Sequence, residues 1–426
     1  MSVHENEAVG GQPWTRQRER WLLLTLAAIQ FTTVLDFLII MPLGPQYRRV
    51  FHLDPSQFGI IVSAYAIAAG VAGVLAGFFL DRFDRRPALL WLYFGFGVGT
   101  LFCALAPTYH LLVAARVMAG AFGGVTGAQI LSIIADMIPP VRRGAAMGMV
   151  MSSFSVASIC GVPIGLRLAS DFDWHMPFLA LTGLSLLVLI ATAAVLPSLR
   201  RHLPHQPAGG AARHLLAIVA HPNHQRAFLF MAVLTFMGFC IFPNVGNYMV
   251  ANVGLKETQL PYIYAIGGLF TVFTMNLVGR WSDRAGNLKV FQICALATVV
   301  PIVLLTNLPP VHPALAITVT TIFWIVMSSR MVPGMALMTA VVEPRQRGSF
   351  MSLNSSVQQF AAGLAALFSG AVLKETETGR ITRFPVTGLC AVVLGFWTIH
   401  LAKSLKAVEE PKPTAPRPEP VAVEAM

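Results

Sequence analysis

Three charged side chains lie inside long apolar stretches of this sequence. Asp36 is the only acidic residue well inside such a stretch, and Arg116 and Arg330 are the two basic ones. A charge at the centre of a membrane-spanning helix costs roughly 2.5–3.5 kcal/mol on insertion scales, so an intramembrane charge usually serves a function. A buried carboxylate beside an arginine can exchange a proton when a bound molecule disturbs the pair. The residue types therefore predict a proton-exchanging pair of Asp36 and Arg116, and the alternative is a static ion pair that fixes two helices together.

The positions of Asp36 and Arg116 along their stretches agree with a direct contact. Asp36 follows Trp21, the first residue of its stretch, by 15 residues, which is about 22 Å along a helix. Arg116 stands near the start of a stretch that runs in the opposite direction, so the two can lie at similar depth. Thr32 and Thr33 precede Asp36 by four and three residues and share its helical face, so we expect them at the same cavity.

Arg330 has no acidic residue in an apolar stretch of its own half. It stands three residues before Pro333, whose ring frees helix carbonyls that an arginine can satisfy. Arg330 is therefore a candidate for binding an anionic substrate group, for meeting Asp36, or for bonding those carbonyls. Other polar residues in apolar stretches are weaker candidates for the cavity, since such groups often only join helices, at about 0.6 kcal/mol each. They are Tyr65, Gln129, Asn244, Asn247, Tyr248, Asn354 and Gln358.

The composition places these residues in a membrane protein. Of 426 residues, 55% are hydrophobic and only 12% are charged, whereas soluble domains spend about 25% on charge. The mean hydropathy is +0.67. These values exclude a secreted disulfide scaffold, a cytosolic enzyme and a disordered chain. The five cysteines all lie within apolar stretches and show no metal-ligand spacing, so we expect no bound metal.

Twelve stretches are long enough to cross a bilayer as helices. We predict an all-α membrane protein with twelve transmembrane helices in two six-helix repeats around a central cavity. Its parts are a cytoplasmic N-terminal segment (1–20), two six-helix bundles (21–197 and 226–405), a cytoplasmic linker (198–225) and a disordered tail (406–426). The spans are 21–44, 56–80, 87–106, 108–138, 143–169, 174–197, 226–251, 258–281, 288–308, 313–342, 348–373 and 384–405.

The basic residues indicate the orientation. With the N-terminus inside, the inner segments hold 21 Lys and Arg and the outer gaps hold 7. This asymmetry places both termini in the cytoplasm, with the chain in the cell (inner) membrane. The net charge of +11 follows from the same distribution and does not indicate nucleic-acid binding. The linker's histidines come without cysteine or carboxylate, so we expect a solvated tether rather than a metal site.

The two halves repeat each other. The loop that begins Gly77-Phe-Phe-Leu-Asp81-Arg82 has a weaker copy at Gly279, 202 residues later. A Pro-x-x-Arg-Gly sequence at residues 140–144 recurs at 344–348, 204 residues later. Two markers at nearly the same offset indicate duplicated halves, an architecture of transporters whose site lies between the repeats.

These motifs resemble those of the major facilitator superfamily. Gly77-xxx-Asp81-Arg82-xx-Arg85-Arg86 is similar to its loop signature, with Asp84 where glycine is usual. Arg116-xxx-Gly120 is similar to its second motif. Gly161-Val-Pro163-Ile-Gly165 resembles, incompletely, the helix-bending motif of its antiporters. The whole pattern looks most like drug/proton antiporters and sugar-efflux permeases. The resemblance implies a conformational latch that shuts the cytoplasmic side in the outward-open state and in which Arg85 meets Asp136; its members are Gly77, Asp81, Arg82, Arg85, Arg86, Asp136, Gly279, Asp283, Arg284 and Arg347.

The sequence therefore predicts a secondary transporter that works by alternating access. We expect a monomeric, proton-coupled antiporter that exports small organic molecules and needs no cofactor. A uniporter or proton symporter for a sugar or nucleoside is the alternative, and a non-transporting receptor is a third hypothesis. Catalysis lacks candidate residues, since the chain has no HExxH, GxSxG or nucleotide-binding loop.

Overall fold

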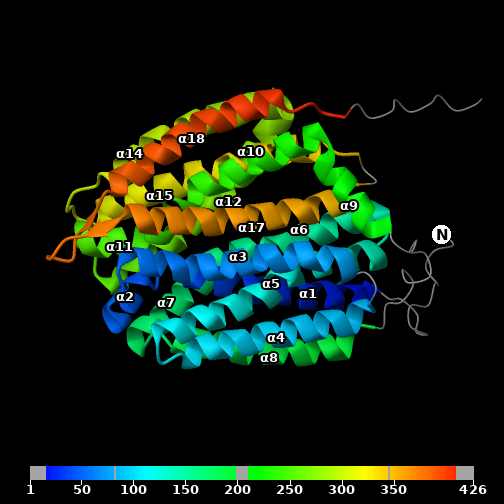
Figure 1. The fold of residues 1–426 in the computed structure, drawn as a ribbon, viewed down its shortest axis with the longest axis horizontal. Helices are drawn as coiled ribbons and strands as arrows, with labels where there is room; N and C mark the ends of the chain where they lie inside the picture. The colour runs from blue at the N-terminus through cyan, green and yellow to red at the C-terminus, as the bar shows by residue number, and fades with distance from the viewer. Residues whose placement is uncertain (1–15, 81–82, 198–209, 344–345, 409–426) are drawn as a thin grey trace, which may run out of the picture.

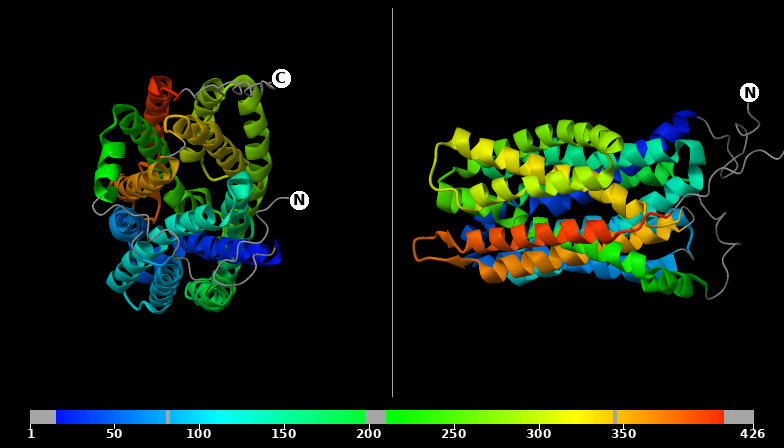
Figure 2. Two further views of the ribbon diagram at one scale, coloured as in Figure 1. Left: turned by 90° about the vertical axis from the view of Figure 1, so that its right-hand side faces the viewer. Right: turned by 90° about the horizontal axis from the view of Figure 1, so that it is seen from above.

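The computed structural model describes residues 16–80, 83–197, 210–343 and 346–408. The long helices run side by side along one axis (Figure 1). We call the end at which α1 begins and α18 ends the terminal end, and the opposite end, which carries α2, the distal end. Viewed along the axis, the N-terminal and C-terminal halves form two adjoining groups (Figure 2).

The N-terminal half contains eight α-helices and one π-helical segment among the described residues. They are α1 (Arg16–Ile39), α2 (Gly44–Phe51), α3 (Pro55–Phe79), α4 (Arg85–Leu105), α5 (Tyr109–Met137), α6 (Pro140–Val156), the π-helix Ala157–Gly161, α7 (Val162–Asp171) and α8 (Met176–Val195).

The spans of the C-terminal half are interrupted more often. Its α-helices are α9 (Gly210–Ala220), α10 (Pro222–Phe239), α11 (Val245–Tyr248), α12 (Leu260–Ala285), α13 (Asn287–Ala297), α14 (Val299–Thr306), α15 (Pro313–Ser329), α16 (Met331–Thr339), α17 (Arg347–Val372) and α18 (Phe384–Ser404). Short 3₁₀ segments (Phe242–Asn244 and Glu257–Gln259) and a π-helix (Met249–Val253) flank α11 and α12. A hairpin of β1 (Lys374–Glu375) and β2 (Ile381–Thr382), which the sequence analysis does not predict, joins α17 to α18.

The prediction of twelve spans is confirmed. Eleven described segments are long and apolar enough to cross a membrane. The twelfth, α17, has 26 residues but is less apolar, because it carries Asn354, Gln358 and several serines. Boundaries differ mainly at the first span, which begins at Arg16 and breaks near Pro42, so that the expected outer gap contains helix α2.

Proline explains the break in the fifth span. Pro163 offers no N–H to the carbonyl of Ile159, and the helix widens into the π segment just before it. The flanking glycines let this span pack closely on α1: a Cβ on Gly161 would lie 2.9 Å from the Leu35 side chain, and one on Gly165 would lie 2.7 Å from Ile39. The motif thus fixes the contact between α1 and the distal part of its span.

The halves meet along most of the length of α3 and α17, which pack antiparallel. Near the distal end, a Cβ on Gly59 would lie 2.7 Å from the carbonyl oxygen of Ala366, and one on Gly370 would lie 2.8 Å from that of Pro55. Toward the terminal end, a Cβ on Gly73 would lie 2.5 Å from the side-chain hydroxyl oxygen of Ser356. Small residues therefore bring the two backbones together, as they do between membrane helices in general.

The second contact between the halves is confined to the distal part. Helix α12 packs against α7 and the π segment, with Gly268 close to Ile159. On α6, by contrast, nothing lies within 4 Å of a Cβ placed on Gly144 or Gly148. The halves are therefore joined at both contacts distally, whereas at the terminal end the close contacts found among the described residues are those of α3 with α17 and with α9.

The expected solvated tether is wrong for one histidine. His224, at the start of α10, is buried, and its Nδ1 lies 2.9 Å from the carbonyl oxygen of Ile218 in α9. The ring also lies 5.1 Å from that of Phe350 of α17, centroid to centroid, in a tilted contact. His224 therefore anchors α9 to the C-terminal half. His202 and His205 lie outside the described residues.

The α3–α17 contact predicts the effect of enlarging Gly370. Gly370→Leu should destabilise the purified protein by about 1–3 kcal/mol, because the added side chain must displace backbone rather than a flexible side chain. Thermal unfolding in detergent measures this. Gly183→Leu is the matched control, since Gly183 is exposed and has nothing within 4 Å of its Cβ position. Equal thermal stability of the two variants would contradict the close contact.

Candidate functional site

Asp36 and Arg116 form a fully buried ion pair between α1 and α5. Arg116 Nη1 lies 2.8 Å from Asp36 Oδ2 and 3.3 Å from the carbonyl oxygen of the same residue. Both side chains are 0% exposed. Asp36 stands one turn before the distal end of α1, so the pair lies in the distal part of the bundle.

Two further side chains complete the surroundings of this pair. Thr100 of α4 donates to Asp36 Oδ1 over 3.3 Å. The guanidinium carbon of Arg116 lies 4.5 Å from the ring centroid of Tyr65 on α3, within the range of a cation–π interaction. Arg116 nonetheless keeps Nε and Nη2 buried without a hydrogen-bond partner. Four helices thus surround the pair, but two of the hydrogen-bond donors of Arg116 are left unpaired.

Aromatic contacts lead from this pair to the other half. Phe37, next to Asp36, lies 5.3 Å from Tyr65 and 5.7 Å from Phe239 of α10, centroid to centroid. The residue next to Asp36 therefore packs directly against a side chain of the C-terminal half.

The two threonines expected beside Asp36 bond inside the N-terminal half. The hydroxyl of Thr32 lies 2.8 Å from that of Tyr93 on α4. Thr33 donates to the carbonyl oxygens of Ile29 and Gln30. Both threonines are buried; Thr32 joins α1 to α4, whereas Thr33 bonds only within α1.

Arg330 lies buried between α10 and the break that separates α15 from α16. It donates through Nε to the carbonyl oxygen of Met327 at 3.3 Å and through Nη2 to that of Leu234 at 3.4 Å. Its Nη1 contacts the Met237 sulfur. No carboxylate of the described residues pairs with it. The structure thus places Arg330 apart from the Asp36–Arg116 pair. Its charge is stabilised by the carbonyl groups of Met327 and Leu234 and by the Met237 sulfur.

The polar residues of the seventh span lie toward the distal end. Asn244 donates to Ser369 of α17 over 3.0 Å, and Asn247 Nδ2 lies 3.4 Å from Asn244 Oδ1. Asn247 Oδ1 is buried without a partner, and the side chain packs against Gly44 of α2 in the other half. Tyr248 donates to the carbonyl oxygen of Leu308 over 3.1 Å.

The remaining polar candidates are scattered. Gln129 donates to the carbonyl oxygen of Arg85 over 3.3 Å, at the terminal end. Asn354 of α17 is buried with Oδ1 unpartnered, and Gln358 is half-buried one turn away. Of the predicted cavity residues, Tyr65 contacts the Asp36–Arg116 pair and Asn244 pairs with Asn247, so the set does not form one cluster.

The loop motifs lie at the terminal end. Arg85 Nε is 3.0 Å from Asp136 Oδ2, the contact that the family resemblance implies, and Arg86 donates to the carbonyl oxygen of Ala193 over 2.7 Å. Gly77 lies near Leu215 of α9 and Gly279 near Val332 of α16. Asp81 and Arg82 lie outside the described residues.

The copy of this motif in the C-terminal half is open to solvent. Asp283, Arg284 and Arg347 are exposed, and no ion pair joins Asp283 to another described residue. The predicted latch role of these three residues therefore stays a prediction.

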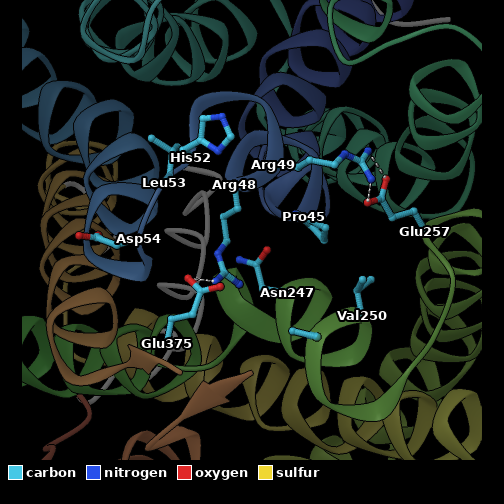
Figure 3. A pocket seen from close by; sticks show the side chains of 11 residues that line it. Pro45, Arg48, Arg49, His52, Leu53, Asp54, Asn247, Val250, Glu257 and Glu375 are labelled. Carbon is cyan, nitrogen blue, oxygen red and sulfur yellow. Dashed lines mark hydrogen bonds and ion pairs between the residues drawn. The ribbon is translucent and has the colours of Figure 1, made fainter. Parts of the chain in front are cut away.

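At the distal end, ion pairs join the halves. Arg48 of α2 lies 2.5 Å from Glu375 of the β1–β2 hairpin, and Arg49 lies 2.9 Å from Glu257 before α12. Among the described residues, these are the two ion pairs between the halves, and we call them the distal gate. They border a cavity of about 490 Å³ that Asn247 also lines (Figure 3).

Sequence reasoning missed the gate and Thr100. Arg48 and Arg49 appear in the sequence only as outer-gap charges, and their acidic partners are 327 and 208 residues away. The sequence contains a partial indication of the gate, because two consecutive arginines follow Pro42, near which the first span ends. The pairing itself depends on the fold.

Two helical halves that are joined by ion pairs at one end, one of them holding a buried ion pair, are the features of a membrane transporter. The family model "Major Facilitator Superfamily" matches residues 26–242 and 227–424. The chain belongs to this superfamily. It is therefore a multi-pass membrane protein that transports small-molecule substrates and is not an enzyme.

Relatives and solved structures agree with this assignment. The uncharacterized MFS-type transporter YceJ of Bacillus subtilis is 25% identical over 85% of this chain and 92% of its own. Multidrug resistance protein 2 of Bacillus subtilis is 22% identical over 65% of this chain and 71% of its own. A bacterial homologue of the human lysosomal transporter Spinster, in an inward-facing and occupied conformation, superposes with a TM-score of 0.72 at 17% identity, covering 92% of this chain and 98% of that one.

The buried pair predicts a double-mutant cycle. Asp36→Leu or Arg116→Leu alone should cost about 3–5 kcal/mol of stability, because each leaves one charge buried without its partner. The double variant should recover most of this loss, since no charge then remains. Thermal unfolding of the purified proteins measures the cycle. The exposed pair of Arg167 and Asp171 is the control and should show little effect, and additive losses at the buried pair would contradict the assignment.

Proposed function

We propose that this protein is a proton-coupled antiporter that exports small organic molecules across the inner membrane by alternating access. The monomer has both termini in the cytoplasm, and bundles 21–197 and 226–405 move against each other about the linker 198–225. Asp36 carries the proton and Arg116 is its counter-charge. The observation that carries the proposal is the fully buried contact between them.

The surroundings of the pair favour proton exchange over a static ion pair. A static buried pair is stable when hydrogen bonds satisfy all its donors, whereas two nitrogens of Arg116 have no partner. When Asp36 takes up a proton, Tyr65 remains as a partner for the arginine, since its ring lies 4.5 Å from the guanidinium. The site can therefore hold Asp36 charged or neutral.

The asymmetry of the two ends supports alternating access. With the terminal end in the cytoplasm, an inward-facing state would account for the closed distal gate and for an Asp283 that forms no ion pair with another described residue. The latch contacts of Asp81 and Asp283 would form when the halves close there. The similarity to Multidrug resistance protein 2 favours export of drug-like molecules over sugar uptake.

The proton site predicts separate effects on uphill and downhill transport. Asp36→Asn should abolish export driven by a pH gradient but leave downhill exchange intact, because a neutral amide resembles the protonated carboxyl. Proteoliposomes would be tested with compounds that the wild-type protein concentrates, drawn from a panel of sugars and of cationic, anionic and neutral drug-like molecules.

Asp171→Asn is the matched control for this experiment, because Asp171 is paired at the exposed surface. It should pump as the wild-type protein does. Uphill transport by Asp36→Asn would show that Asp36 is a structural partner only. A wild-type protein that moves substrate without any proton flux would favour the uniporter hypothesis.

The distal gate predicts a second, smaller effect. An exposed ion pair contributes about 0.2–1 kcal/mol, so Arg49→Glu should shift the equilibrium toward the outward-open state by a factor of about 1.4–5. Asn247→Cys supplies the probe, since Asn247 is 1% exposed and lies between the halves. Its labelling by a membrane-impermeant maleimide in intact cells should accelerate by that factor.

The charge-swapped variant is the control for the gate. Arg49→Glu combined with Glu257→Arg restores an ion pair and should restore slow labelling. Labelling that stays fast in the swapped variant, or never changes in Arg49→Glu, would refute a gating role for this pair.

A further inference from the structure

Three aromatic side chains from separate segments of the C-terminal half gather beside the boundary between the halves. Trp324 of α15 lies 4.8 Å from Phe242 and 5.9 Å from Tyr264 of α12, measured between ring centroids. We call these three residues the aromatic wall. Gly267 of α12 makes room for it, because a Cβ there would lie 2.7 Å from the Trp324 ring.

The polar atoms of the aromatic wall have no hydrogen-bond partner. Trp324 Nε1 and Tyr264 Oη are both buried, and neither bonds to any other described atom, although the two residues as a whole are only half-buried. Buried Trp and Tyr usually find partners for these groups, and a native structure that leaves them unpaired calls for an explanation. Two such atoms on neighbouring rings indicate a place for a ligand.

The chain that follows α1 lies near one edge of the aromatic wall. A Cβ on Gly246 would lie 3.5 Å from Tyr264 Oη and 3.4 Å from the Cα of Pro42, which belongs to the other half. Pro42 follows Asp36 by six residues. A ligand that reaches Tyr264 Oη therefore lies close to the chain segment that follows the proposed proton site.

Ring contacts give a second connection to that site. From the aromatic wall, Phe242 lies 5.7 Å from Phe239, and Phe239 lies 5.7 Å from Phe37. Phe37 contacts Tyr65, over which the guanidinium of Arg116 lies. A ligand on the aromatic wall is thus linked to the ion pair by packed rings as well as by α1.

We infer that the aromatic wall is the substrate-binding surface and that its substrates are neutral, flat aromatic molecules carrying a hydrogen-bond acceptor. This inference rests on the proposed transport function and names its substrate class. The rings of Phe242, Tyr264 and Trp324 stack on the flat part of the molecule. Trp324 Nε1–H can only donate, and Tyr264 Oη can donate as well, so the polar group that fits both is an acceptor oxygen. Neither atom bonds to a charged side chain of the described residues, which favours a neutral ligand.

Two probes of similar shape test the acceptor. Flavone is flat, neutral and carries a carbonyl oxygen, whereas phenylnaphthalene is its hydrocarbon counterpart. Equilibrium binding of each radiolabelled probe is measured on the full-length protein in nanodiscs without a pH gradient, and empty nanodiscs give the lipid partitioning. The wild-type protein should bind flavone about 10-fold or more tightly than phenylnaphthalene, because two hydrogen bonds are gained.

Conservative variants assign this difference to the two atoms. Trp324→Phe and Tyr264→Phe keep the rings and should each weaken flavone binding about 3- to 10-fold, with no change for phenylnaphthalene. Trp397→Phe and Tyr262→Phe are matched controls, since these residues are 43% and 57% exposed, and they should bind both probes as the wild-type protein does.

Equal wild-type affinity for the two probes would overturn the inference, as would unchanged flavone binding in both wall variants. These results are independent of proton coupling, because binding is measured without a gradient. If flavone binding requires Trp324 and Tyr264 but Asp36→Asn still pumps substrate uphill, the aromatic wall stands and the proposed proton coupling fails. If the two probes bind equally while Asp36→Asn stops uphill export, the proposed proton coupling is supported and the aromatic wall is not the substrate-binding surface.

Discussion

The buried contact between Asp36 and Arg116 is the constraint on which the arrangement of the N-terminal half depends. Opposite charges in a region without water are tolerable only while they remain together, since removal of one partner costs about 3–5 kcal/mol. The helices that carry them, α1 and α5, must therefore stay in register, and α3 and α4 supply Tyr65 and Thr100 to the same site. If Asp36 takes up a proton, as we propose, Tyr65 and Thr100 can still contact the two side chains of the pair. The C-terminal half has no comparable pair among its described residues, and Arg330 there is held by carbonyl oxygens and a sulfur.

The contacts between the halves differ in strength in a way that suits a moving protein. Along α3 and α17, glycines bring backbone against backbone, and such a contact tolerates sliding better than separation. At the distal gate the halves are joined by partly exposed ion pairs, each of small free energy. At the terminal end, α6 stands away from α12. A transporter needs two states of similar free energy, and weak, reversible contacts at the ends provide them while the α3–α17 contact persists.

The sequence was sufficient for the fold because lipid imposes a simple rule. Every span must be apolar and helical, so the twelve stretches and the repeat at Gly77 and Gly279 determine the architecture. Asp36 and Arg116 could also be predicted as site residues from the sequence, since a charge within a span is rare. The distal gate was not, because Arg48 and Glu375 are ordinary outer-loop residues until the hairpin places them together. Trp324 was also hidden, since an aromatic residue in an apolar stretch indicates packing, and only its unpartnered Nε1 distinguishes it.

We propose that substrate and proton are linked by α1, which carries Asp36, and by the segment after it, where Pro42 lies beside Gly246 near Tyr264. The most direct test is the number of protons released when a ligand binds. Flavone would be added to the wild-type protein in weakly buffered detergent solution, at a pH where Asp36 is protonated in the absence of ligand, and the released protons titrated with a pH indicator. The account predicts release of about one proton per bound ligand and none in Asp36→Asn. Binding without proton release, or equal release by the wild-type protein and Asp36→Asn, would contradict it.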